Sequence, residues 1–204
     1  MKECDPQLYE NIVHQLCVLM RLEETGKLNI YYGDESGFSL EPYIPYGWQP
    51  PGEYVKIVSE TSPRLNVFGI LSRDNKMHAY SVIGSVDTDT IIACINDFVK
   101  NIVMKTVLVL DNASVHSSKK FKAKMDGWME KGLQIFHLPP YSPHLNPIET
   151  LWRKIKYEWL KPVDYKSWDS LQNAIERILK SVGDKHRINF SETEFFKKHK
   201  ASII

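Results

Sequence analysis

Residues 106–116, with the sequence TVLVLDNASVH, decide the fold of this chain. The run TVLVL at 106–110 is apolar almost throughout and predicts a central strand buried on both faces, as in parallel sheets covered by helices. Apolar residues at helical spacing before this strand predict a helix over 88–103. After the strand, the sequence predicts a lysine-rich helix over 118–131 and a further strand over 133–138. This alternation of helices and strands indicates an α/β domain.

A second set of strands precedes this core. Alternating apolar residues predict strands over 28–41, 65–72 and 77–84, with a further strand-like run at 54–60. The segment 42–53 contains four prolines and two glycines and therefore predicts a loop. Antiparallel strands followed by helix, strand, helix, strand and helix predict a mixed sheet with helices on its faces.

Three further helices are predicted outside this central region. Apolar positions at helical spacing place them over 6–24, 147–160 and 168–182. We expect one principal domain with a shorter segment on either side. The division is a leader helix at 1–27 that serves as a linker or dimer contact, an α/β domain at 28–162, and a helical tail at 163–204 that packs on the same domain.

The composition is typical of a soluble globular protein. Of 204 residues, 43% are hydrophobic and 25% are charged, and no apolar run approaches the ~18–20 residues that cross a membrane. The charged N-terminus does not resemble a signal peptide. The three cysteines include no CxxC pair, which disfavours a disulfide framework or a cysteine-rich zinc site. We therefore expect a cytoplasmic protein without a membrane partner.

The net charge of +1 conceals an uneven distribution. Residues 1–60 carry a net charge of −6, residues 61–100 carry 0, residues 101–161 carry +5 and residues 162–204 carry +2. A local excess of positive charge favours a polyanionic partner, whereas solvated charged faces are the plainer explanation. The near-neutral total therefore does not exclude a protein that acts on nucleic acid.

Three acidic residues stand in unusual sequence settings. Asp34 lies within an apolar strand pattern, Asp111 ends the buried run, and Glu149 begins an apolar helix. Burying a carboxylate is costly unless it is paired, and converging carboxylates repel one another. A divalent cation removes that repulsion, and oxygen ligands of this kind suit Mg²⁺ or Mn²⁺.

Each of these residues also has a purely structural explanation. Asp34 fits a turn in the run DESG, and Asp111 fits an Asx turn that closes a strand. The segment 146–149 fits a capping box at a helix start, with Pro147 as the first helical residue. A glutamate at position 149 can also point into a site, so a structural role and a functional role are compatible there.

Together the three motifs resemble those of the DDE transposases. The motifs are Asp34 in YYGDESGF, Asp111 in VLVLDNASVH and Glu149 in LPPYSPHLNPIETLW. The most similar group is the mariner-like insertion-sequence transposases, described as DDE superfamily endonucleases, and the resemblance covers residues 28–160. The 37 residues between Asp111 and Glu149 are slightly more than is usual in that group, which a longer loop around 131–143 would explain.

The resemblance implies an RNase H-like (retroviral-integrase-like) fold, that is, an α/β mixed five-stranded sheet flanked by helices. It implies that Asp34 and Asp111 bind metal from neighbouring strands and that Glu149 completes the catalytic site from its helix. These residues would hold two Mg²⁺ or Mn²⁺ ions, which activate the attacking oxygen and stabilise the leaving oxygen in a displacement at phosphorus. The implied function is metal-dependent cleavage of DNA at transposon ends and strand transfer into target DNA.

Two other functions share these features. Another RNase H-like nuclease, acting on branched DNA or RNA–DNA hybrids, would use the same carboxylates. A catalytically inactive, transposase-derived DNA-binding protein would have the same fold, although all three acidic residues are present here. The long motif around Glu149 favours the transposase.

Basic and polar residues near the motifs are candidates for DNA contacts, which would make binding weaken with salt. The candidates are Asn112, His116, Lys119, Lys120, Lys122 and Arg153. The alternatives are a contact with the metal site for Asn112 and His116, solvated helix faces for the basic residues, and a core or cap position for His116. Trp48 either stacks on a base or covers the core. His137 and His144 match no zinc-ligand spacing.

The resemblance also implies partners. Transposases of this group carry N-terminal helix-turn-helix modules that recognise element ends, whereas a single predicted helix precedes Asp34. We therefore expect a catalytic half that acts on DNA and forms a homodimer when two ends are synapsed. The alternatives are the second reading frame of a split or frameshifted element, a degraded remnant and a fragment, and a separate helix-turn-helix polypeptide is one candidate for recognising the ends.

Overall fold

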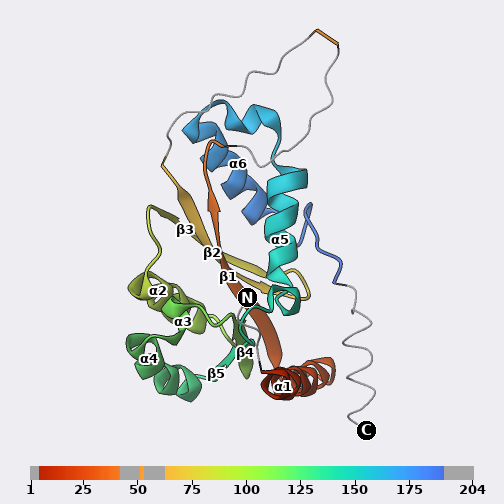
Figure 1. The fold of residues 1–204 in the computed structure, drawn as a ribbon, viewed down its shortest axis with the longest axis vertical. Coiled ribbons are helices and arrows are strands. Elements are labelled where there is room, and N and C mark those ends of the chain that lie inside the picture. The colour runs from red at the N-terminus through yellow and green to blue at the C-terminus, as the bar shows by residue number, and fades with distance from the viewer. Residues whose placement is uncertain (1–4, 42–50, 53–62, 191–204) are drawn as a thin grey trace.

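The computed structural model describes residues 5–41, 51–52 and 63–190. Its centre is a five-stranded sheet with the strand order β3-β2-β1-β4-β5 (Figure 1). The strands are β1 (Asn29–Phe38), β2 (Leu65–Ser72), β3 (Met77–Ile83), β4 (Thr106–Leu110) and β5 (Leu133–His137). The pairs β1–β2 and β2–β3 are antiparallel, whereas β1–β4 and β4–β5 are parallel. The prediction of a mixed sheet is confirmed.

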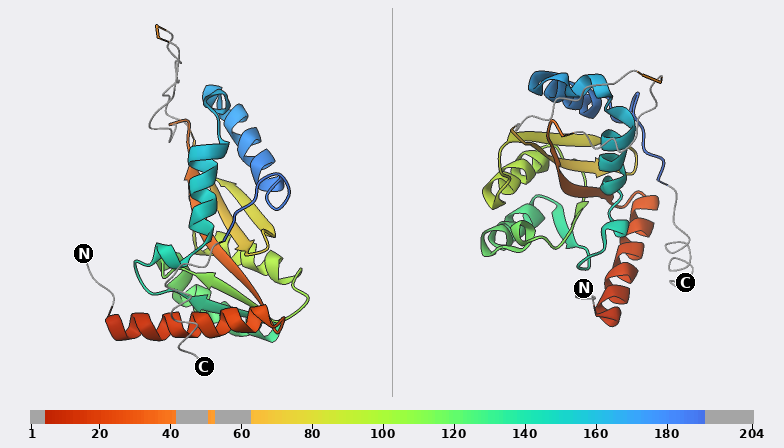
Figure 2. Two further views of the ribbon diagram at one scale, coloured as in Figure 1. Left: turned by 90° about the vertical axis from the view of Figure 1, so that its right-hand side faces the viewer. Right: turned by 45° about the horizontal axis from the view of Figure 1, so that its top comes forward.

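Helices cover both faces of this sheet (Figure 2). The longer ones are α1 (Pro6–Glu24), α2 (Thr88–Val99), α4 (Lys119–Glu130), α5 (Ile148–Lys154) and α6 (Trp168–Lys180). The shorter ones are α3 (Ser114–Ser117), η1 (Pro143–Leu145), η2 (Ile155–Trp159) and η3 (Pro162–Lys166). One apolar cluster joins α1, α5 and α6 to one sheet face, and a second joins α2 and α4 to the other. No helix in the described part of the chain is both long and apolar enough to cross a membrane.

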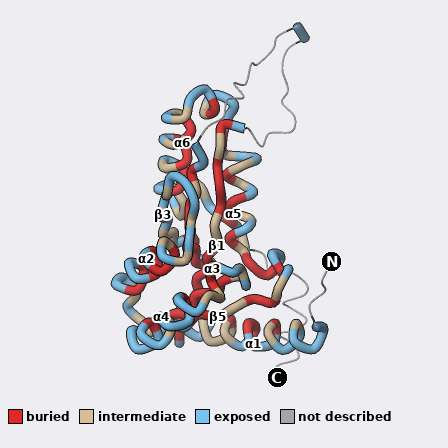
Figure 3. Tube along the Cα trace, turned by 60° about the vertical axis from the view of Figure 1, so that its left-hand side comes forward, coloured by how far each residue is buried: buried red, intermediate tan, exposed pale blue. Residues whose placement is uncertain are grey.

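The alternation of side chains along β1 explains the two clusters. Ile30 and Tyr32 belong to the cluster with α1, α5 and α6, whereas Tyr31 belongs to the cluster with α2 and α4. Because successive strand residues point to opposite faces, Asp34 faces the α5 side and Glu35 faces the α2 side. All five residues of β4 are buried, which confirms the predicted central strand. Figure 3 shows this buried interior beside the exposed outer surfaces of the helices.

Side-chain caps fix where two of the helices begin. The carboxylate of Asp87 accepts a hydrogen bond from the backbone nitrogen of Thr90 at 2.8 Å, which starts α2. The hydroxyl of Ser118 accepts one from the backbone nitrogen of Phe121 at 3.1 Å, which starts α4. Each cap satisfies a backbone N–H group that has no partner within its helix. Ser118 also separates α3 from α4, so the lysine-rich helix is preceded by a short helix that was not predicted.

The other predicted elements have different ends or lie outside the described residues. The helix α2 ends at Val99 rather than at residue 103, and Val103 is 94% exposed. The predicted helix 147–160 is α5 followed by the π-helical turn η2. The described part of the C-terminal tail packs on the same core, since α6 shares a cluster with α1 and α5. The strand-like run 54–60 and Trp48 lie outside the described residues.

Candidate active site

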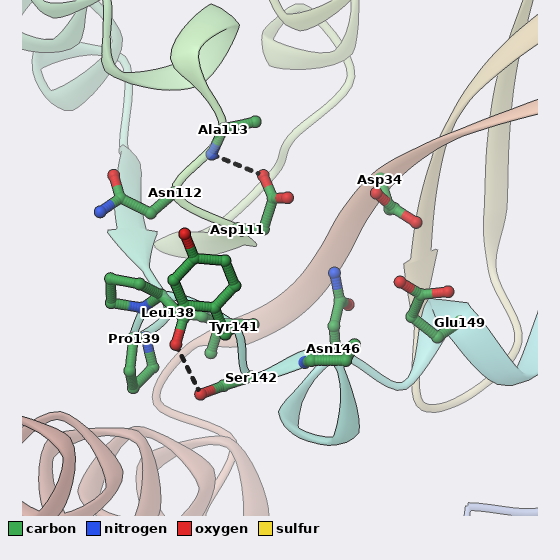
Figure 4. A pocket seen from close by; sticks show the side chains of 12 residues that line it. Asp34, Asp111, Asn112, Ala113, Leu138, Pro139, Tyr141, Ser142, Asn146 and Glu149 are labelled. Carbon is green, nitrogen blue, oxygen red and sulfur yellow. Dashed lines mark hydrogen bonds between the residues drawn. The ribbon is translucent and has the colours of Figure 1, made fainter. Parts of the chain in front are cut away.

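One pocket of about 330 Å³ brings together the three acidic residues that the sequence singled out (Figure 4). Asp34 comes from β1, Asp111 directly follows β4, and Glu149 lies in the first turn of α5. Residues 112–113, 138–143 and 146 contribute the remaining walls. The pocket therefore lies where the end of a buried parallel strand meets the start of a helix.

The parallel pairing of β1 with β4 explains how two of the carboxylates meet. The register places Tyr32 beside Val109. Two residues further along each strand, Asp34 and Asp111 therefore lie at the same level. Their separation in sequence is bridged by the sheet, so this meeting depends on strand order and register.

The helix α5 is seated on the sheet by Trp152. Its indole ring lies over Gly69 of β2, where an added Cβ atom would be 2.7 Å from the ring. The absence of a side chain at Gly69 therefore allows the close approach of α5. The indole Nε1 also donates a hydrogen bond to Oδ2 of Asp34 at 3.0 Å. Trp152 thus fixes the helix that carries Glu149 and orients the carboxyl group of Asp34.

The carboxyl group of Asp34 is held in an environment that disfavours its charge. Burial raises the pKa of Asp34, and the nearby carboxylates of Glu149, Glu35 and Asp111 raise it further, to about 8. Both effects penalise the ionised form. Without a cation in the pocket, Asp34 therefore carries a proton at neutral pH.

The carboxylate of Asp111 has the opposite electrostatic setting. Nδ1 of His116 lies 2.8 Å from Oδ1 of Asp111, and the backbone N–H of Ala113 donates to the same oxygen at 3.1 Å. The bond from Ala113 forms the Asx turn that the sequence offered as a structural alternative. The hydrogen bond from His116 lowers the pKa of Asp111, although burial opposes this effect. Asp111 is therefore ionised at a pH where Asp34 is protonated.

His116 lies inside the protein. Its side chain is 0% exposed, and its Nε2 lies 3.0 Å from Oε1 of Glu35. Burial alone would lower the pKa of His116, but hydrogen bonds to Asp111 and Glu35 outweigh burial and raise it to about 9. A side chain without exposed surface does not contact DNA in this conformation. The structure therefore corrects the expected DNA contact at His116 in favour of the alternative, a buried histidine.

Asn146 does not form the predicted capping box. The helix α5 begins at Ile148 without a side-chain cap, and the amide nitrogen of Asn146 instead donates to the backbone oxygen of Gly33 at 3.1 Å. The amide oxygen of Asn146 is buried at the pocket wall and has no hydrogen-bond partner among the residues that the structure describes. The carboxylate of Glu149 is not engaged at the helix start and points toward Asp34 (Figure 4).

Positive charge lies beside Glu149 on the outer side of the pocket. Partial burial raises the pKa of Glu149, whereas nearby Lys156 acts to lower it. A neighbouring groove of about 480 Å³ shares Glu149 with the first pocket and includes Arg153 and Lys156 in its walls. A groove of this sign leading to acidic residues suits a phosphate backbone.

The residues at the pocket fit a divalent cation by their chemistry. Three carboxyl groups and the unpartnered amide oxygen of Asn146 are hard oxygen donors, which Mg²⁺ and Mn²⁺ prefer. Burial is the largest cause of the raised pKa of Asp34, and the neighbouring carboxylates, whose charge a cation would neutralise, raise it further. Among the described residues, no three His, Cys, Asp or Glu side chains lie close enough to share one ion as they stand. Binding of one ion by all three carboxyl groups therefore requires them to move closer together.

The remaining DNA-binding candidates lie at the surface. They are Asn112, Lys119, Lys120, Lys122 and Arg153. Asn112 lines the acidic pocket, and Arg153 lines the adjoining groove. Lys120 forms an ion pair with Asp89. The structure therefore leaves these five side chains accessible to a polyanion and places two of them beside the carboxylates.

Three residues of the site were not predicted as such. Tyr141 lines the pocket, is 77% exposed and has a left-handed backbone with a φ of 58°. Glu35 and Trp152 contribute through the contacts described above. Strand alternation beside Asp34 was an available signal for Glu35, because it places Glu35 on the opposite face of the sheet. The contact of Trp152 with Asp34 depends on helix placement, which periodicity does not give.

The fold is similar to that of solved transposase structures. The Mos1 Strand Transfer Complex has a similar structure, with a TM-score of 0.58, 12% identity, and coverage of 98% of this chain and 59% of that chain. The catalytic domain of Mos1 mariner transposase gives a TM-score of 0.56 at 10% identity, over 98% of this chain and 90% of that chain. The predicted RNase H-like fold is confirmed.

A comparison of sequences identifies the family to which the chain belongs. Residues 29–172 match the family model described as DDE superfamily endonuclease, and the chain belongs to this family. A relative is the uncharacterized protein y4pE/y4sA of Sinorhizobium fredii (strain NBRC 101917 / NGR234), which is 34% identical over 65 residues, or 32% of this chain and 44% of the relative. The chain spans 59% of the length of the Mos1 chain in the Strand Transfer Complex.

Proposed function

We propose that this chain is the catalytic domain of a transposase that cleaves DNA at transposon ends and transfers the cut strand into target DNA. The observation that supports this function most directly is the meeting of Asp34, Asp111 and Glu149 in one pocket. Membership of the DDE family agrees with it. So does the similarity of fold to a Mos1 transposase paired-end complex with left transposon end.

Asp34, Asp111 and Glu149 are the proposed ligands of two Mg²⁺ or Mn²⁺ ions. The similar Mos1 complexes with Mg and with Mn support this assignment. When bound, such ions activate an attacking oxygen and stabilise a leaving oxygen at phosphorus. Asp111 is ionised beforehand, whereas Asp34 must release its proton, so cation binding is expected to release protons and to strengthen as the pH rises.

DNA is proposed to bind along the basic surface next to the pocket. Arg153 lines the groove that shares Glu149 with the acidic pocket, and Asn112 lies at the pocket wall. The exposed lysines of α4 provide phosphate contacts further away, at positions 119, 120 and 122. These contacts follow the phosphate backbone and therefore make binding depend on salt.

The proposal extends to the partners of the chain. Two transposon ends must be cut together, so we propose a homodimer at the synapsed ends, with α1 as its contact. We also propose that a separate helix-turn-helix polypeptide recognises the ends and that the protein acts in the cytoplasm. Size measurements with and without end DNA test the dimer.

A cleavage and joining assay tests the function. The substrates are supercoiled plasmid and a precut duplex with a free 3′-hydroxyl, each carrying the DNA that flanks the gene. The wild-type chain is expected to nick plasmid and join the precut strand with Mg²⁺ or Mn²⁺, and neither with EDTA. Asp111→Asn and Glu149→Gln should lose both activities while remaining folded. Asp126→Asn, which removes an exposed carboxylate of α4, is the matched control and should retain both.

The outcomes separate the alternatives. Cleavage without joining, with a preference for branched DNA or RNA–DNA hybrids, would indicate another RNase H-like nuclease. DNA binding without cleavage in either metal would indicate an inactive DNA-binding protein. Activity in Asp111→Asn equal to that of the wild type would contradict the proposed site.

A further inference from the structure

A buried imidazole connects two carboxylates from different strands. His116 in α3 lies between Asp111, at the end of β4, and Glu35 in β1. Its two ring nitrogens are 2.8 Å and 3.0 Å from the respective carboxylate oxygens, and its side chain is fully buried. Each ring nitrogen of His116 therefore has a carboxyl oxygen as its hydrogen-bond partner. A buried group with both nitrogens engaged in this way has a fixed orientation.

The packing around His116 fixes the plane of its ring. The ring centroid lies 6.3 Å from that of Phe68 and 6.1 Å from that of Phe121. The backbone of the same residue is held by a hydrogen bond from its nitrogen to the carbonyl oxygen of Ala113 at 3.0 Å. His116 is thus a rigid element, and the carboxylate of Asp111 is the more exposed partner, with a side-chain exposure of 49%.

The two carboxylate oxygens of Asp111 differ in their hydrogen bonds. Within the described part of the chain, His116 and the backbone of Ala113 both donate to Oδ1. Oδ2 is then directed to the pocket that contains Asp34 and Glu149. Without these bonds, a half-exposed aspartate would rotate freely and would lose entropy when it bound a cation.

Glu35 is placed to hold His116 from the other side. It directly follows Asp34 in β1, so its side chain leaves the opposite face of the sheet and reaches α3. Of these two consecutive residues, Asp34 thus contributes a carboxyl group to the pocket, and Glu35 contacts His116, which in turn contacts Asp111. Metal-binding carboxylates are commonly oriented by such outer hydrogen bonds.

We propose that Glu35 and His116 are positioning residues that hold Asp111 in the orientation required to bind a divalent cation. This inference rests on the proposed function, which makes Asp111 a metal ligand. Glu35 orients Asp111 only through His116. This orienting contribution therefore disappears when His116 can no longer reach Glu35, whereas the charge of Glu35 acts on Asp34 in either case.

Mn²⁺ binding, measured from the EPR signal of free Mn²⁺ without DNA, tests this proposal independently of cleavage. His116→Ala should weaken binding by roughly 10- to 100-fold, the usual effect of losing an outer-shell partner. His116→Asn should weaken it less, because an amide nitrogen at the position of Nδ1 can still donate to Asp111. His137→Gln is the matched control. The ring of His137 lies 3.3 Å from the backbone oxygen of Asp111 and does not orient its carboxylate, so binding should change by less than about threefold.

A double-mutant cycle tests the role of Glu35. Glu35→Ala should weaken Mn²⁺ binding several-fold in the wild-type background and clearly less in His116→Asn. Asparagine is too short to reach Glu35, so only the charge effect of Glu35 on Asp34 remains in that background. Equal weakening in both backgrounds would overturn the proposal, because Glu35 would then act independently. Unchanged binding in folded His116→Ala would also overturn it. If His116→Ala fails to fold, the Glu35→Ala pair decides.

A comparison with Asp111→Asn separates this proposal from the proposed function. If Asp111→Asn binds Mn²⁺ as the wild type does, Asp111 is not a ligand and both proposals fail. If Asp111→Asn loses binding while the substitutions at Glu35 and His116 do not weaken it, only the positioning role fails. Thermal unfolding of each variant without metal identifies losses that come from instability alone.

Discussion

At the scale of single residues, the carboxyl groups of Asp34 and Asp111 have pKa values that are shifted in opposite directions. Burial and neighbouring carboxylates raise the pKa of Asp34 to about 8, whereas the hydrogen bond from His116 lowers the pKa of Asp111. One carboxyl group therefore enters the pocket neutral and the other charged. This arrangement limits repulsion in the metal-free protein and leaves both groups available to a cation.

The raised pKa of Asp34 predicts how stability depends on pH without metal. Below about pH 4 the carboxyl group of Asp34 is protonated in both the folded and the unfolded chain. Its ionisation therefore does not lower the free energy of unfolding there. As the pH rises toward 8, the unfolded chain releases the proton more readily, so wild-type stability falls relative to Asp34→Asn. The amide introduced by this substitution cannot ionise and can still accept the hydrogen bond of Trp152. In urea unfolding with EDTA, we expect the variant to gain roughly 4–6 kcal/mol on the wild type between pH 4 and 8.5, which is about 1.4 kcal/mol for each unit that separates the folded and unfolded pKa values of Asp34. A difference independent of pH would contradict the assignment.

The indole N–H of Trp152 predicts a separable effect on metal binding. Trp152→Phe keeps an aromatic ring over Gly69 but removes the 3.0 Å hydrogen bond to Asp34. We expect Mn²⁺ binding to weaken by about 10-fold, as for other outer-shell bonds. Trp128→Phe is the matched control, because its Nε1 donates to Asn96 at 2.8 Å, between α4 and α2. Calorimetric titration should show no change in the control, and equal effects of the two substitutions would refute a specific role for Trp152.

The sequence predicted the three acidic residues but not the contacts that hold them. Asp34, Asp111 and Glu149 stand out because each interrupts an apolar pattern or begins a helix. The bond between Trp152 and Asp34 joins residues 118 positions apart, and the bond between His116 and Glu35 joins residues 81 positions apart. Such contacts are set by strand register and helix placement. Patterns of hydrophobicity do not encode them directly.

At the scale of secondary-structure elements, the position of α5 depends on the surface of β2. The ring of Trp152 occupies the space that a side chain at Gly69 would need. Glu149 is carried on the same helix, and Asn146 ties the preceding loop to Gly33 of β1. The sheet therefore determines where Glu149 lies through one glycine contact and one amide hydrogen bond.

The contact of Gly69 with α5 predicts a coupled loss of stability and metal binding. In Gly69→Ala, the Cβ atom would lie 2.7 Å from Trp152 and 2.9 Å from Met77, so the helix must move. We expect a loss of about 1–3 kcal/mol in urea unfolding, as for overpacked cores, together with weaker Mn²⁺ binding. Gly127→Ala in α4 meets no atom within 4 Å and should stabilise the protein by about 0.5–1 kcal/mol. If Gly69→Ala is neutral in both measurements, the close approach has no functional importance.

The elements themselves were largely predictable, and their ends were not. The five strands and the longer helices of the described chain follow apolar periodicity, as in α2 and β4. The capping box expected at Asn146 was wrong because its amide bonds to Gly33 of β1 instead of the start of α5. A short-range pattern predicted that cap, and a contact between distant segments overrode it.

At the scale of the whole molecule, the near-neutral charge is divided between regions. The excess of positive charge lies in residues 101–161, which include the exposed lysines of α4 and Arg153 beside the acidic pocket. The sheet separates α4 from α6, because the two helices belong to different apolar clusters. A DNA-binding surface on the α4 side is therefore distinguishable by substitution from the basic residues of the α6 side.

This distribution predicts a local effect on the salt dependence of DNA binding. Replacing both Lys119 and Lys122 by glutamine should reduce the slope of log affinity against log salt by about 2, since each phosphate contact contributes about 0.9. The charge-matched control replaces Lys166 and Lys180, which are exposed in η3 and α6. The slopes are measured by fluorescence anisotropy over a salt series, with Ca²⁺ in place of Mg²⁺. The control variant should have the same slope as the wild type. Equal changes in the two double variants would indicate attraction by overall charge instead of a defined surface.

The most direct test of the account is anomalous diffraction from crystals of the protein grown with Mn²⁺. We expect manganese peaks in the pocket between Asp34, Asp111 and Glu149, with Oδ1 of Asp111 still bound to His116. Crystals of Asp111→Asn under the same conditions should show weaker peaks or none. Manganese only at other positions, in crystals whose concentration of Mn²⁺ supports DNA cleavage in solution, would contradict the claim that these three carboxylates form the catalytic metal site.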